Sequence, residues 1–132
     1  MKIPIIIEEN AGIDRMREPV RVGVPFPQGA LLDADEACLA VPVRVELLSG
    51  ASGRDRPALR RSLSALPVLY PTDDTWRLID GWVDVAGASG ERFGFADLLI
   101  GALAKESGSL VWSLDADFER MSGLGFVELY EP

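Results

Sequence analysis

The amino-acid sequence predicts an α/β fold in which a parallel β-sheet is flanked by helices. Short apolar runs alternate with segments of helical spacing along most of the 132 residues, and this alternation is typical of the βα units that build parallel sheets. The apolar runs hold few polar positions, as expected for strands that are covered on both faces. The length predicts a single domain over 1–132.

The N-terminal quarter combines a strand with an extended segment. Residues 3–7 (IPIII) predict a buried strand that stops at Glu8 and Glu9. Residues 17–29 contain three prolines and alternating valines, a pattern typical of an extended segment or an edge strand and not of a helix. We therefore distinguish an atypical N-terminal segment, 1–30, from the regular alternation that follows.

Prolines and glycines mark the ends of the later elements. Pro42 suits the first turn of a helix, where its missing N–H costs nothing, and Gly50 closes that helix. Thr72 or Asp73 caps a later helix, and Gly108 ends the most apolar one. The predicted strands after the first are 37–41, 67–70, 110–114 and 126–130; the predicted helices are 42–50, 57–66, 73–90, 96–107 and short ones at 31–36 and after 115.

The composition excludes several kinds of chemistry. The chain has no histidine and one cysteine, Cys38, which excludes His-dependent nucleophilic catalysis, His-ligated metal sites and an internal disulfide. Cys38 lies in an apolar run and is expected to be a buried, inert thiol. Neither standard Gly-rich phosphate-binding motif occurs. Carboxylates remain as the working groups, and carboxylates without histidine suit hard cations such as Mg²⁺ or Mn²⁺.

Charge and aromatic content bear on nucleic-acid binding. The net charge of −8 disfavours a protein that binds nucleic acid through a basic face. Trp76, Trp82 and Trp112 occur in periodic apolar runs and are predicted to lie in the core rather than on a base-stacking surface. A nuclease whose acidic residues are neutralised by metal ions remains compatible with this charge.

Targeting signals are not apparent in the sequence. No apolar run approaches the ~20 residues that span a bilayer. The N-terminus lacks the apolar region and cleavage site of a signal peptide. A cytoplasmic location is the resulting expectation.

Three acidic residues are predicted to meet at one edge of the sheet. Asp97 opens a helix, Asp115 ends a strand, and Glu46 lies on the short helix after another strand. In a parallel α/β sheet the carboxyl ends of strands and the N-termini of helices share an edge, where ligand sites form. Helix capping is the alternative role for Asp97, Asp115 and Asp117, and a surface position is the alternative for Glu46.

From about Leu31 onward the sequence resembles the PIN-domain ribonucleases, in particular the VapC-type toxins of bacterial toxin–antitoxin pairs. The resemblance rests on four segments in matching order and spacing: ACLAVPVRVELLSGA, LRRSLSALPVLYPTDDTWRL, GERFGFADLLIGALAKESGSLVWSLDADFERM and LGFVELY. It implies a PIN-like domain over 31–132, with a five-stranded parallel sheet flanked by helices. It also implies an acidic cluster that holds Mg²⁺ or Mn²⁺ and cuts RNA.

The resemblance assigns a role to each acidic residue. Glu46 matches the family's helix glutamate, Asp97 the aspartate that opens the later helix, and Asp115 the last acid, with Asp117 as a neighbour that assists or replaces it. The family's first strand runs into an aspartate, where this chain has IIIEEN and then the Pro-rich stretch. Glu8, or its neighbour Glu9, is the candidate for that position, although its side chain is one methylene longer.

Taken together, the resemblance implies a Mg²⁺- or Mn²⁺-dependent endoribonuclease that is the toxin of a type II toxin–antitoxin system. Its partners would be an RNA substrate, a cognate antitoxin and a second copy of the chain. Arg54, Arg56, Arg60 and Arg61 are candidates for RNA contacts, or equally for a solvated face.

Two other interpretations remain open. A PIN-like scaffold with weak or no catalysis would still dimerise and bind an antitoxin, and the missing aspartate favours this alternative. The first 30 residues also resemble the start of a β-rich domain found in some polysaccharide-lyase-type proteins, which would suggest an all-β fragment.

Overall fold

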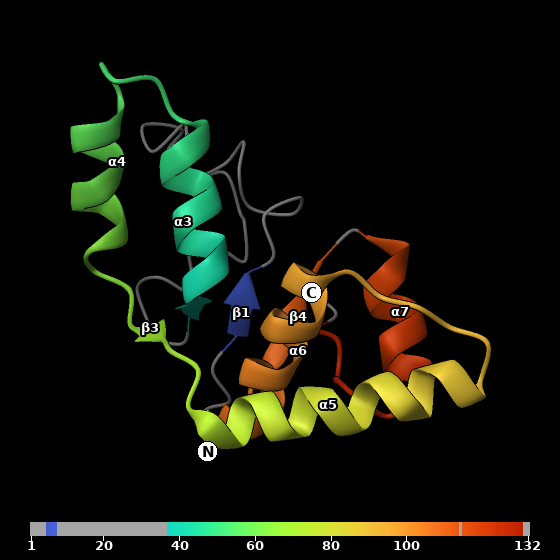
Figure 1. Ribbon diagram of the computed structural model, residues 1–132. Coiled ribbons are helices and arrows are strands. Elements are labelled where there is room, and N and C mark those ends of the chain that lie inside the picture. The colour runs from blue at the N-terminus through green and yellow to red at the C-terminus, as the bar shows by residue number, and fades with distance from the viewer. Residues whose placement is uncertain (1–4, 8–36, 114, 131–132) are drawn as a thin grey trace.

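The structure, a computed structural model, describes residues 5–7, 37–113 and 115–130. In this part of the chain a parallel sheet is flanked by five helices (Figure 1). The strands are β1 (Ile5–Ile7), β2 (Ala37–Ala40), β3 (Val68–Leu69) and β4 (Leu110–Trp112). They lie in the order β3-β2-β1-β4, and every neighbouring pair is parallel. The predicted α/β class is confirmed, and the all-β interpretation is wrong.

The N-terminal strand lies in the middle of the sheet. Ile6 of β1 is paired with Cys38 of β2 on one side and with Val111 of β4 on the other. The chain therefore adds strands first to one side of β1 and later to the other. Such a switch point opens a crevice at the carboxyl ends of the strands, where ligands bind in open parallel sheets. The predictions for 17–29 and 31–36 lie outside the described residues.

The helices begin and end at the predicted signals. Pro42 lies in the first turn of α3, Thr72 is the N-cap of α5, and Gly108 ends α6 with a left-handed φ of 67°. The bounds are Val41–Gly50 for α3, Arg56–Leu63 for α4, Asp73–Ala88 for α5, Phe95–Ser107 for α6 and Ala116–Gly123 for α7.

Arg56 fixes the turn between α3 and α4, which lie side by side in Figure 1. Its Nε donates to the carbonyl of Leu48, and its Nη2 donates to the carbonyl of Ala51, both at 2.9 Å. The last carbonyls of a helix have no partner within the helix. The guanidinium therefore supplies the missing donors at the end of α3.

A buried threonine joins α5 to α6. The Thr72 N–H donates to Thr75 Oγ1 at 2.9 Å, which is one half of a capping box. The Thr75 hydroxyl in turn donates to the Glu106 carboxylate of α6 at 2.5 Å. Since Thr75 is fully buried, these two hydrogen bonds satisfy its hydroxyl and hold α5 against α6.

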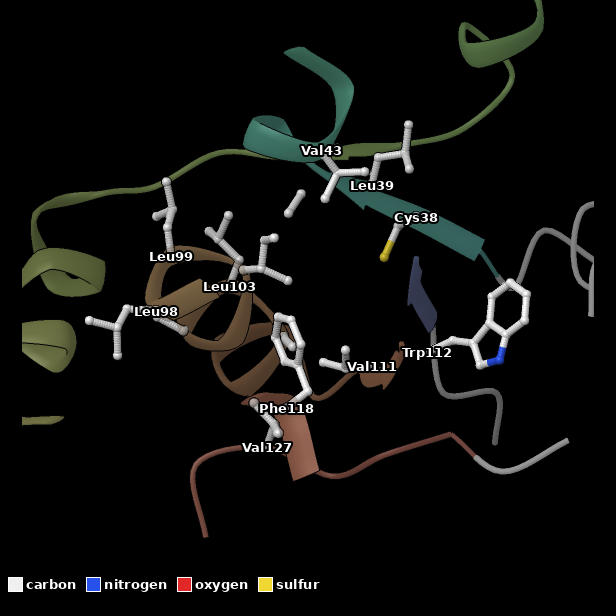
Figure 2. Packing of buried hydrophobic residues seen from close by; sticks show 14 of the residues in the cluster. Cys38, Leu39, Val43, Leu98, Leu99, Leu103, Val111, Trp112, Phe118 and Val127 are labelled. Carbon is white, nitrogen blue, oxygen red and sulfur yellow. The ribbon is translucent and has the colours of Figure 1, made fainter. Parts of the chain in front are cut away.

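The helix α6 forms the centre of the hydrophobic core, because every residue from 98 to 104 is buried. Figure 2 shows Leu103 of α6 and Phe118 of α7 between the helices and the strands, with Val111 of β4 beside them. Cys38 of β2 belongs to the same cluster and is 4% exposed, as predicted. Burial raises the pKa of its thiol, an effect that the hydrogen bond with Ser109 partly opposes.

Gly101 permits α6 to approach α7 closely. A Cβ at this position would lie 2.6 Å from Met121 Cε, 3.1 Å from Val127 Cγ1 and 3.3 Å from Trp82 Cζ3. The helical stripe that contains Gly101 also contains Asp97, one turn earlier. The absence of a side chain at 101 therefore controls the spacing between the two helices below the candidate site.

Two predictions differ from the structure. The predicted strand 126–130 is reduced to a single parallel bridge between Leu129 and Val111, because the Phe126 N–H instead donates to the Met121 carbonyl at the end of α7. The prediction of a core position for Trp76 is also wrong, since it is 41% exposed and stacks on exposed Phe95. The other two tryptophans are buried as predicted.

None of the helices in the described part of the chain combines the length and the hydropathy needed to cross a membrane.

Candidate metal centre

Asp97 is held at the start of the most buried helix. It is the third residue of α6, after the N-cap Gly94, and it is half-buried. The N-cap residue Gly94 provides no capping side chain. The acidic residue in the first turn of α6 is Asp97. The partial positive charge at a helix N-terminus favours a carboxylate at this place. Because the following turns of α6 are packed on all sides, the backbone of Asp97 is firmly positioned.

Asp115 and Asp117 are placed by the connection from β4 to α7. The Asp115 N–H donates to the Ser113 hydroxyl at 2.9 Å. Asp115 is the N-cap of α7, and its Oδ1 accepts from the Asp117 N–H at 2.9 Å. The predicted capping role of Asp115 is thus confirmed. A carboxylate has two oxygens, so this hydrogen bond leaves Asp115 capable of a second interaction.

The three aspartates come together at the carboxyl edge of the sheet. One carboxylate oxygen of each of Asp97, Asp115 and Asp117 lies within 4.8 Å of the others, and all three residues are half-buried. We call these three residues the acidic cluster. Two oxygens that share one Mg²⁺ are at most about 4.2 Å apart, because each Mg–O bond is about 2.1 Å. The cluster therefore fits a hard divalent cation after small side-chain rotations.

Comparison with known proteins gives the family of this fold and site. The family model of the PIN domain matches residues 27–124, which is most of the chain. The chain belongs to the PIN domain family. Proteins of this family are generally nucleases and typically use divalent metal ions. Among proteins with curated annotation, none matches the sequence.

Solved structures with the same fold cover nearly the whole PIN domain. VapBC2 from Rickettsia felis, bound to a DNA fragment from its promoter, has a TM-score of 0.77 at 15% identity, covering 97% of this chain and 98% of the other. FitAcB from Neisseria gonorrhoeae has a TM-score of 0.68 at 19% identity and covers 97% of both chains. A toxin–antitoxin complex from Klebsiella pneumoniae has a TM-score of 0.66 at 16% identity, covering 97% and 99%.

Glu46, which was also predicted for the site, lies outside the acidic cluster. Glu46 is on α3 with its side chain exposed, and it is not among the described residues whose carboxylate oxygens gather within 4.8 Å. The contact between α3 and α6 nevertheless keeps Glu46 and Asp97 on neighbouring elements. Glu8 and Glu9 follow β1 but lie outside the described residues.

The predicted RNA-binding arginines differ in their surroundings. Arg54 lies in the loop before α4, and Arg60 and Arg61 lie in the last turn of α4; all three are exposed. Arg56 is half-buried and its guanidinium is bound to the carbonyls at the end of α3. It has a structural role that the sequence prediction missed.

A cation that was not predicted from the sequence lies beside the acidic cluster. Arg120 Nη2 lies 2.9 Å from Asp117 Oδ1, and its Nε donates to Glu91 Oε1 at 3.1 Å. The spacing of three residues between Asp117 and Arg120 on a predicted helix was the signal that could have found this pair. Glu91 lies in the loop before α6, and no local pattern connects it to α7.

Proposed function

We propose that this PIN domain is a Mg²⁺- or Mn²⁺-dependent endoribonuclease and the toxin of a type II toxin–antitoxin pair. The observation that carries the proposal is the convergence of Asp97, Asp115 and Asp117, whose carboxylate oxygens lie within 4.8 Å of one another. They gather beside the switch point of a parallel sheet, where this type of fold forms its ligand sites. Hard divalent cations prefer oxygen ligands of this kind.

The charge of the cluster explains why a metal ion is needed. Three carboxylates at this separation repel one another and also repel an RNA phosphate. A bound divalent cation supplies a water of lowered pKa and offsets the charge of the scissile phosphate. Asp97 and Asp115 would be ligands from two different elements, so that the ion also links α6 to the start of α7. Asp117 would be a third ligand or a neighbour that assists Asp115.

Two glutamates would complete the site from farther away. Glu46 on α3 would act through a water, because its exposed side chain lies outside the cluster. Glu8 follows the central strand β1, whose end lies beside the end of β4 in the sheet register. It would occupy the position of the aspartate that ends the first strand in the family.

The macromolecular partners follow from the same assignment. The exposed arginines Arg54, Arg60 and Arg61 would contact the RNA backbone, whereas Arg56 is engaged at the end of α3. The similar Klebsiella structure is a toxin–antitoxin complex, which supports an antitoxin as the protein partner. We further propose a homodimer in the cytoplasm and one domain over the whole chain.

An Asp97→Asn variant tests the metal-dependent nuclease. We expect it to lose Mn²⁺-dependent cleavage of total cellular RNA by at least about a hundredfold, because a ligand oxygen and a negative charge are removed. Asp80→Asn is the matched control, since Asp80 is exposed on α5 and lies outside the cluster. Both variants should keep the wild-type circular dichroism. Equal cleavage by the Asp97→Asn and Asp80→Asn proteins would refute the assignment.

A catalytically weak scaffold that binds an antitoxin is the second candidate. It is favoured by the position of Glu46 outside the cluster and by the ion pair of Asp117 with Arg120, both of which reduce the ligand set. A direct Mn²⁺ titration separates the two functions. The nuclease predicts saturable binding that Asp97→Asn weakens, whereas the scaffold predicts weak binding that the substitution does not change.

A further inference from the structure

We propose that Arg120 is a built-in counter-cation of the acidic cluster, which pairs with Asp117 in the metal-free protein and opposes the binding of a divalent ion. The inference rests on the proposed function, because it concerns the same cluster. It adds a residue that sets the metal affinity without itself being a ligand.

The guanidinium of Arg120 is held from three directions. Its Nη2 lies 2.9 Å from Asp117 Oδ1, and its Nε lies 3.1 Å from Glu91 Oε1. Its central carbon lies 5.3 Å from the centre of the Phe93 ring, within the range of a cation–π contact. Arg120 therefore connects the loop before α6 to α7 on the edge of the cluster.

The ring beneath Arg120 is anchored in the core. Phe93 is buried and meets Phe126 edge to face at 6.2 Å, and Phe126 stacks on Trp82 at 4.3 Å with an interplanar angle of 4°. This aromatic series gives Arg120 a rigid support. The position of its charge beside Asp117 is thus a property of the fold and not of one mobile side chain.

A second ion pair of the same spacing shows how Arg120 differs from a simple surface arginine. Arg77 and Asp74 on α5 also form a pair three residues apart, at 2.7 Å, but their side chains are 73% and 81% exposed. The corresponding values for Arg120 and Asp117 are 41% and 35%. Exposed pairs of the first kind contribute little, so Arg77 is a suitable control for the loss of one arginine.

The direction in which Arg120 changes the metal affinity follows from the charges of the guanidinium and the metal ion. A guanidinium that contacts Asp117 lies within several ångströms of any ion that the cluster binds. At a separation of about 6 Å in water, the repulsion between the single charge of the guanidinium and the double charge of the metal ion weakens metal binding by about tenfold. Without a metal ion, the same guanidinium offsets the mutual repulsion of the three carboxylates. If Arg120 instead served to aim Asp117 at the metal, its removal would weaken binding.

Mn²⁺ titration of the chain, followed by electron paramagnetic resonance of the free ion, tests the proposal. We expect Arg120→Gln to bind Mn²⁺ about tenfold more tightly than wild type. Arg120→Lys should stay near wild type because the charge is kept, and Arg77→Gln should be unchanged. In EDTA, Arg120→Gln should have a lower melting temperature than Arg77→Gln, and saturating Mn²⁺ should remove that difference. Arg120→Met, which keeps the packing on Phe93, serves the same test if the glutamine variant does not fold.

The outcomes separate this inference from the proposed function. If wild type binds Mn²⁺ and Asp97→Asn weakens the binding, the proposed metal site is supported. If Arg120→Gln and Arg120→Met then bind Mn²⁺ no more tightly than wild type, only the proposed role of Arg120 is refuted. If Arg120→Lys loses affinity as well, Arg120 positions Asp117 and does not compete. If neither wild type nor the Arg120 variants show saturable binding, both the metal site and the counter-cation are refuted.

Discussion

Replacing Gly101 by alanine would test whether the acidic cluster depends on the close approach of α6 and α7. The added methyl group would lie 2.6 Å from Met121 Cε, 3.1 Å from Val127 Cγ1 and 3.3 Å from Trp82 Cζ3. Met121 Cε is the end of a flexible side chain and can move, but Met121 is itself fully buried. The substitution therefore pushes α6 away from α7 one turn below Asp97.

The expected magnitude combines two opposing effects. Overpacking of a filled core costs about 1–3 kcal/mol, while alanine in a helix interior is favoured over glycine by about 1 kcal/mol. The net loss for Gly101→Ala is about 0–2 kcal/mol. Gly81→Ala is the matched control, because Gly81 lies in the middle of α5 and a Cβ there meets nothing within 4 Å. It should gain about 0.5–1 kcal/mol, so the difference between the two variants isolates the packing effect.

Urea denaturation gives the free energy of unfolding of each variant, and Mn²⁺ titration reports the geometry of the cluster. We expect Gly101→Ala to be less stable than Gly81→Ala by about 1–3 kcal/mol and to bind Mn²⁺ more weakly than wild type. In a Met121→Ala background the penalty at Gly101 should shrink, because the space for the methyl group is then available. Equal stability of Gly101→Ala and Gly81→Ala would refute the argument that the helix contact is tight.

Three further predictions concern single contacts. Thr75→Val should lower the free energy of unfolding by about 1–3 kcal/mol in urea, because the Thr72 N–H and the α6 carboxylate lose a buried partner; Thr72→Ser is the control. Arg56→Ala should cost about 1–2 kcal/mol in the same assay, whereas exposed Arg60→Ala should stay within about 0.5 kcal/mol and should lower RNA affinity in a filter-binding assay. Burial raises the pKa of the Cys38 thiol above its usual 9.0, so the thiol loses its proton at lower pH in the unfolded chain than in the folded chain. The free energy of unfolding therefore falls as pH rises above 9.0. Cys38→Ala should show a smaller decrease in stability over this pH range, and parallel stability curves for the two proteins would contradict this.

Local signals were sufficient to predict most of the helices. Pro42, Thr72 and Gly108 act at helix ends through the backbone conformation that each residue favours, and these effects depend on few neighbours. The alternation of strands and helices likewise follows from sequence because each βα unit is local. The position of β1 between β2 and β4 depends on contacts far apart in the chain, and periodicity carries no information about it.

The errors arose where tertiary packing overrides a pattern. Trp76 has helical spacing with buried residues, yet the buried stripe of α5 contains Thr75, Trp82 and Ala86. A polar hydroxyl takes a core position because Glu106 is available to accept its hydrogen bond, and only the packing of α6 provides that acceptor. The strand expected near Leu129 is short because the chain after Gly125, with φ of 81°, is bound to the end of α7.

Capping and metal binding, which the sequence presents as alternatives for the aspartates, are compatible in the structure. Asp115 caps α7 through one oxygen, and this bond fixes the direction of its carboxylate. Asp97 lies in the first turn of α6, so two helix N-termini face the cluster with partial positive charge. Together with Arg120 they stabilise three neighbouring negative charges in the absence of an ion. The features that cap the helices are therefore the same features that hold the cluster together for a metal, and a test of either role needs a readout for both stability and Mn²⁺ affinity.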